Sequence, residues 1–131
     1  MSMQTRYTFG TRVPLPLDRV RPTVEAALRA EGFGVLTEID VAATLKKKLG
    51  KDMPPYKILG ACNPQFAHEA IELEPQIGAL LPCNVVVRVE GGKTIVEIMD
   101  PDSVLRLVEA PGIGAIASQV RERLERVLAA L

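Results

Sequence analysis

Two short segments carry the side chains with the most chemical potential. The first is Cys62-Asn63-Pro64, where a thiol precedes a helix start, because Asn is a good N-cap and Pro fits the first helical turn. Backbone N–H groups and the dipole at a helix N-terminus stabilise a thiolate, so we expect a lowered pKa for Cys62. The second segment, Cys83-Asn84, lies where a strand is expected to begin.

His68 is the only histidine and follows Asn63 by about one helical turn. Three chemistries are then open: Cys62 as a nucleophile with His68 as base, a soft-metal site of Cys62, Cys83 and His68, or a redox pair of the two thiols. Each requires a proximity that a sequence does not show, and a zinc site would lack a ligand. Free cysteines often only pack, and His68 lies on a polar helix face, so structural roles are the simpler interpretation.

No strong catalytic motif accompanies these residues. G-x-S-x-G, the P-loop and H-E-x-x-H are absent, and the Gly-Ile-Gly run at 112–114 lacks the rest of a dinucleotide fingerprint. Glu69, Glu72 and Glu74 form the solvated face of a predicted helix. We therefore expect no cofactor and name no catalytic residue.

Composition limits the classes of partner. The 131 residues suit a single domain spanning 1–131, and 16 basic residues balance 16 acidic ones. Without a basic excess we expect no nucleic acid as partner, and the lysines at 46–48 suit the C-terminal end of a helix. No apolar run is long enough to span a bilayer and the N-terminus does not read as a signal peptide, so we expect a cytoplasmic protein with reduced thiols and no membrane partner. Few asparagines and more arginine than lysine are typical of a thermophilic source.

Hydrophobic periodicity predicts alternating strands and helices. Strands are expected at 5–13, with Tyr7, Phe9 and Val13 facing inward, and at 33–39, with Ile39 facing inward. Asp18 is expected to cap a helix whose start shifts later so that Pro22 falls in its first turn. The remaining predicted elements are a helix from Asp40 to Leu49, a strand at 56–62 and helices at 64–73, 103–109 and 113–130.

The region 84–99 predicts a β-hairpin around a Gly91-Gly92 turn, since glycine accepts positive φ at both positions. The register then places three residue pairs on the core face: Val89 with Thr94, Val87 with Val96, and Val85 with Ile98. The opposite face is mixed rather than polar, so another subunit or a loop could cover it; its residues are Val86, Arg88, Ile95, Glu97 and Met99.

A strict β-α-β order would give a parallel sheet, but the strands alternate polar with apolar residues, as antiparallel sheets do. We therefore predict an α+β fold with a single, mainly antiparallel sheet of about five strands and helices packed on one face. If the strands at 56–62 and 84–90 are antiparallel, both thiols lie at one end of the sheet; if parallel, they lie at opposite ends.

The segment 56–64, continuing through Ala67 and Ala70 to 81–87, resembles the family called domain of unknown function 302. The stretches 32–35 and 39–40, and Asp100-Pro101 after the hairpin, are similar to that family as well. The resemblance implies a small α/β sandwich, similar in outline to TATA-binding-protein-like and helix-grip folds. It also suggests a homodimer, and it implies no activity.

We therefore expect a non-enzymatic module, homodimeric, that binds a small apolar ligand between sheet and helices or a protein partner. Its candidate ligand-binding residues are Cys62, Asn63, His68, Cys83 and Asn84. The alternative is a thiol-based redox or metal-handling protein that uses Cys62 and Cys83. A hydrolytic or isomerase enzyme with a site invisible in the sequence is the third possibility.

Overall fold

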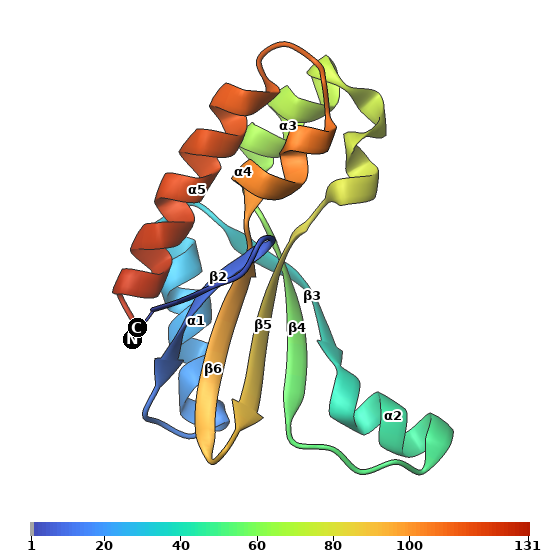
Figure 1. Ribbon diagram of the computed structural model, residues 1–131, viewed down its shortest axis with the longest axis vertical. Coiled ribbons are helices and arrows are strands. Elements are labelled where there is room, and N and C mark those ends of the chain that lie inside the picture. The colour runs from blue at the N-terminus through green and yellow to red at the C-terminus, as the bar shows by residue number, and fades with distance from the viewer. Residues whose placement is uncertain (1) are drawn as a thin grey trace.

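The computed structural model describes residues 2–131, which form one six-stranded antiparallel sheet with helices on one face (Figure 1). The strand order is β1-β2-β6-β5-β4-β3. The predicted α+β class and antiparallel sheet are confirmed, with one strand more than expected. The elements are β1 (Ser2–Gln4), β2 (Thr8–Val13), α1 (Leu17–Ala30), β3 (Gly34–Asp40), α2 (Val41–Leu49), β4 (Tyr56–Cys62), α3 (Pro64–Leu73), η1 (Pro75–Leu80), β5 (Cys83–Glu90), β6 (Lys93–Met99), α4 (Pro101–Val104), η2 (Leu105–Leu107) and α5 (Ile113–Ala129).

The central hairpin forms in the predicted register. Val85 pairs with Ile98 and Val87 with Val96, and all four side chains are fully buried against the helices. The turn glycines have φ values of 58° and 77°, which side chains rarely tolerate. On the opposite face Arg88 pairs with Glu97 at 2.7 Å. That face therefore combines ion pairs with apolar residues, as expected.

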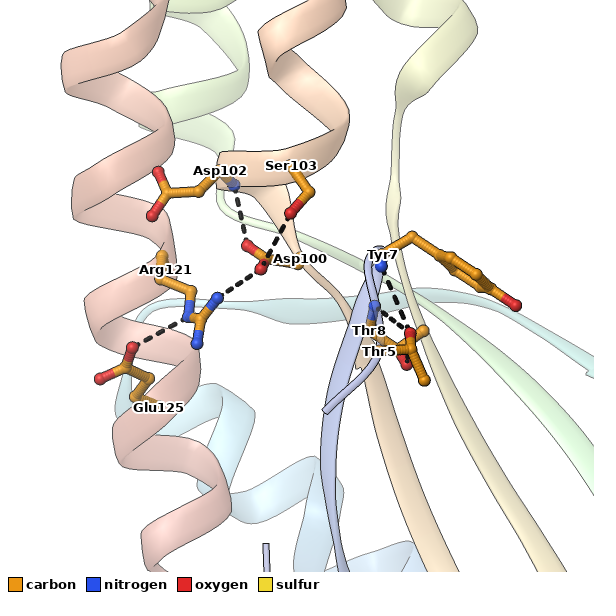
Figure 2. A network of polar contacts seen from close by, with 8 residues as sticks. All are labelled: Thr5, Tyr7, Thr8, Asp100, Asp102, Ser103, Arg121 and Glu125. Atoms are coloured by element: carbon orange, nitrogen blue, oxygen red, sulfur yellow. Dashed lines mark hydrogen bonds and ion pairs between the residues drawn. The ribbon is translucent and has the colours of Figure 1, made fainter. Parts of the chain in front are cut away.

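The extra strand arises because the chain turns sharply before β2. Thr5 Oγ1 accepts hydrogen bonds from the backbone N–H groups of Tyr7 and Thr8, at 3.3 and 3.0 Å, and this turn folds β1 back onto β2 (Figure 2). The prediction of one continuous strand over 5–13 was wrong for this reason. Tyr7 is consequently exposed, whereas Phe9 and Val13 are buried as predicted.

Helix α1 begins earlier than predicted, at Leu17. Pro16 is its N-cap residue and makes no side-chain cap, so Asp18 lies in the first turn instead of capping it. Pro22 lies inside the helix at an exposed position. Proline has no backbone N–H, so one helical hydrogen bond is missing there, on the solvent side. The helix buries one apolar stripe against the sheet, formed by Leu17, Val20, Val24 and Leu28.

A register shift between Val35 and Thr37 changes which residues of β3 face the core. Phe33 is buried and Val35 packs against the core, but the side chain of Ile39 is 50% exposed. A bulge inserts one residue and reverses the alternation after it, so the inward orientation predicted for Ile39 was wrong. No helix among residues 2–131 is both long and apolar enough to cross a membrane.

Candidate functional site

A cavity of about 340 Å³ opens at one end of the sheet. Its walls come from the ends of β3, β4 and β5, from α3 and η1, and from one turn of α5, the cluster drawn in the upper part of Figure 1. Among the described residues that line it none is charged, and the polar side chains are Thr37, Asn63 and the thiols of Cys62 and Cys83. The cavity therefore suits an apolar guest with few polar groups.

The antiparallel pairing of β4 with β5 places both cysteines at this end. Ala61 lies opposite Cys83 in the ladder, and Cys62 follows Ala61 at the last position of β4. Both thiols are free and both line the cavity. The sequence left open whether these two strands are parallel or antiparallel. The antiparallel pairing brings both thiols to one site.

The two thiols stay neutral near pH 7. Burial away from water raises the pKa of Cys83 to about 11, with a smaller repulsive contribution from Cys62. Burial also raises the pKa of Cys62, so the predicted lowering by the helix N-terminus is wrong in direction. The apolar side chains around the cavity disfavour the charged thiolate at both positions.

His68 does not belong to this site. Its Nε2 lies 3.1 Å from Glu72 one turn along α3, and the side chain is largely exposed. Asn84 is exposed too and pairs with Gly60 on the other face of the sheet. Within residues 2–131 no group of three or more His, Cys, Asp and Glu side chains could hold a metal ion. Of the five predicted binding residues, the structure therefore brings Cys62, Asn63 and Cys83 together and leaves His68 and Asn84 outside.

Asn63 lines the cavity and caps α3, as predicted. Its Oδ1 accepts a hydrogen bond of 3.2 Å from the backbone N–H of Phe66. Phe66 and Ala70 on α3 are buried behind the cap, whereas Ile71 and Leu73 are about half exposed. Ile71 also lines the cavity, so its exposed surface is part of the opening.

Gly60 does not itself line the cavity, but its missing side chain lets two lining residues approach β4. A Cβ at this position would lie 2.2 Å from Thr37 Oγ1 and 2.9 Å from Pro82 Cγ. Both neighbours line the cavity. The missing side chain therefore lets β3 and the segment before β5 close against β4. An isolated glycine inside a strand pattern is the signal that could have indicated this close approach.

A buried ion pair fixes α5, which forms the back wall through Ile116 and Val120. Asp100 is 2% exposed and accepts hydrogen bonds from the N–H of Asp102, from Ser103 Oγ and from Arg121 (Figure 2). The Arg121 guanidinium also lies over the Phe9 ring, 4.1 Å from its centroid. This network joins the end of β6 to α5, and none of its residues lines the cavity.

Comparisons with known proteins agree with this fold. The model of the family "Domain of unknown function DUF302" matches residues 9–131. The chain is also similar to a solved structure, the crystal structure of an uncharacterized conserved protein DUF302 from Bacillus stearothermophilus. The two share 30% sequence identity with a TM-score of 0.89, over 96% of this chain and 98% of the other. A search of curated proteins finds no match.

The family model covers nearly the whole chain, and the solved structure shares both its sequence and its fold over the same length. The segments at 56–64 and 81–87, which resemble the family, each contribute three residues to the lining of the cavity. The chain belongs to the DUF302 family.

Proposed function

We propose that this protein is a non-enzymatic module that binds a small, mostly apolar molecule in the cavity between α3, η1 and the end of the sheet. The observation that carries the proposal is the cavity itself, about 340 Å³ and without a charged lining residue in the described chain. Ligand pockets typically measure about 300 to 1,000 Å³ and are mostly apolar. An apolar guest of matching size would gain the free energy of leaving water.

The opening of the cavity adds support. Leu36 and Ile71 line it and are 68% and 45% exposed, so a seated ligand would cover apolar surface on both sides of the entrance. Large apolar side chains that rim a concave site are common at ligand-binding grooves. A bound molecule would therefore remove from water both its own surface and that of the rim.

The thiol-based alternative has one favourable observation and one against it. Both thiols line a single cavity, which a redox pair would require. However, burial raises the pKa of both, and only the thiolate is a good nucleophile or metal ligand. We therefore place Cys62 and Cys83 in the binding surface rather than in a reaction.

The cytoplasmic location expected from the sequence is supported by the two free thiols, and remains part of the proposal.

The test is binding of a neutral apolar probe, 1-octanol, measured by calorimetric titration. Replacing Ala67, which lines the cavity, by Leu fills part of its volume. Ala115→Leu makes the same change on an exposed position of α5 outside the cavity and is the matched control. We expect Ala67→Leu to weaken octanol binding at least about tenfold, because the guest loses space, and Ala115→Leu to leave it unchanged. Equal affinity in all three proteins, or no binding to the unmodified protein, would refute the proposal.

A further inference from the structure

Asn63 has an unused hydrogen-bond donor beside the cavity. The residue is only 9% exposed, and its Oδ1 is occupied by the helix cap. Within residues 2–131 its Nδ2 donates no hydrogen bond. The Nδ2 atom keeps access to solvent, since no fully buried side-chain nitrogen or oxygen in the described chain lacks a hydrogen-bond partner. Water or a ligand is therefore its acceptor.

Arg123 on α5 supplies a second set of donors at the same place. Its Nη1 donates to the backbone oxygen of Glu31 at 3.1 Å, and its guanidinium lies 5.1 Å from the centroid of the Phe66 ring. Arg123 forms no ion pair with a carboxylate in the described chain, whereas Arg121 and Arg126 on the same helix each do. Because Arg123 donates only this one hydrogen bond within residues 2–131, most of its five guanidinium N–H donors remain available.

Gly32 allows these two groups to converge. Its φ of 88° is a left-handed conformation that follows the end of α1. A Cβ built there would lie 3.0 Å from Asn63 Nδ2 and 3.2 Å from Arg123 Nη1, so both nitrogens border the same point. The positive end of the α3 dipole lies at Asn63 as well. Amide, guanidinium and helix end therefore create a local preference for negative charge.

This group of donors adjoins the apolar cavity. Asn63 and Phe66 both line the cavity, and Arg123 stacks on Phe66 about one turn beyond Val120, another lining residue. We infer that the ligand of this protein is an amphipathic anion, with an apolar body in the cavity and a carboxylate at Arg123 and Asn63. The inference rests on the proposed function and narrows its ligand class. Arginine and amide N–H groups are the usual partners of a carboxylate, and hydrogen bonds to a charged acceptor are the stronger kind.

The structural role of Arg123 at the end of α1 does not account for the whole arrangement. Its bond to the Glu31 oxygen satisfies one carbonyl of that helix end. It leaves Asn63 Nδ2 without an acceptor and Arg123 without a counter-charge. Both features are explained together by one bound carboxylate.

The test compares three probes of equal chain length, octanoate, 1-octanol and octylamine, by calorimetric titration at pH 7. We expect octanoate to bind at least about tenfold more tightly than octanol, because one charge-assisted hydrogen bond supplies that difference in affinity. Octylamine should bind most weakly. Arg123→Gln should remove the preference for octanoate, so that octanoate and octanol bind with similar affinity. Arg126→Gln, which removes the same charge from an ion-paired position one turn away, should retain the preference.

Asn63→Asp provides a second variant that folds, because Asp caps helices as well as Asn does. It exchanges the free donor for a negative charge, so it should reverse the preference for octanoate over octanol. Equal binding of octanoate and octanol to the unmodified protein would overturn the inference and leave the proposed function standing. An equal loss of both probes in Arg123→Gln would also overturn it, since that is the result of a purely structural arginine. No binding of any probe would refute the proposed function itself.

Discussion

Ala61 of β4 lies directly opposite Cys83 of β5, and this single pairing decides where both thiols are. Because the two strands are antiparallel, the end of β4 and the start of β5 meet at the same edge, beside the N-terminus of α3. The cavity forms at that edge, with Cys62 and Cys83 in its lining. The thiols are therefore neighbours in a desolvated site, and their chemistry follows from the burial.

We predict that the native thiols react slowly with an alkylating reagent at neutral pH. The pKa of Cys83 is raised to about 11, so its alkylation rate should keep rising up to that pH instead of levelling off near the ordinary cysteine value. Mass spectrometry of iodoacetamide-treated protein at successive pH values measures this. A fully alkylated native protein at pH 7 would contradict the account, whereas rapid labelling after unfolding is the expected control.

The same shift predicts a loss of stability in alkali. The folded state holds Cys83 as a thiol up to about pH 11, while the cysteine in the unfolded chain has an ordinary pKa of 9.0. The unfolding free energy should therefore be unaffected by this group below pH 9 and fall as the pH rises from 9 to 11. Urea titrations at several pH values test this, with Cys83→Ala as control. A slope that persists undiminished in the variant would assign the effect to other groups.

Gly60→Ala should destabilise the protein by about 1 to 3 kcal/mol, because the new methyl group would contact Thr37 and Pro82 well inside van der Waals distance. Gly114→Ala is the matched control: it lies in α5 with no neighbour within 4 Å of the added methyl. This control should be neutral or more stable by up to about 1 kcal/mol. Thermal unfolding followed by circular dichroism gives both values, and equal stability of the two variants would contradict the close packing.

Asp100→Ala should cost about 3 kcal/mol, since it leaves the mostly buried Arg121 with only its exposed partner Glu125 and frees the N–H of Asp102. Glu125→Ala removes the exposed partner of the same arginine and should cost less than about 1 kcal/mol. Urea unfolding measures both. If both variants lose a similar amount of unfolding free energy, the buried Asp100–Arg121 pair stabilises the fold no more than the exposed pair does.

The homodimer that the family resemblance implies stays a prediction. Sedimentation velocity should give a species of about twice the 14.2 kDa chain mass at micromolar concentration. The mixed sheet face, with Val86 and Met99 only partly buried, is the surface for which the sequence suggested cover by another subunit or by a loop. A single species of chain mass at high concentration would refute the dimer without affecting the cavity.

Local signals predicted the elements that depend on neighbouring residues. The Gly91-Gly92 turn determined the hairpin register, and the Asn63-Pro64 pair determined where α3 begins, because turn and cap geometry are properties of short segments. The antiparallel sheet followed from the alternation within strands.

The remaining features depend on contacts between distant segments. The bulge after Val35 and the turn at Thr5 each shift the alternation of the strand by a residue or two. The hydrophobic pattern of the sequence does not show where such a shift occurs. The cavity brings together α3, η1, α5 and three strand ends, so no local pattern could indicate it. In the sequence, Arg123 is one of several arginines on the polar face of α5. Only the packing of α5 against α3 shows that it lies beside Asn63 and Phe66.

The most direct test of the central claim is to locate 1-octanol on the protein by intermolecular NOEs to methyl groups. We expect NOEs to Leu36, Ile71 and Val120, which line the cavity. We expect none to Ile58 and Val86, which pair with each other on the uncovered face of the sheet. NOEs confined to Ile58 and Val86, or their absence from every methyl group at saturating octanol, would contradict the claim.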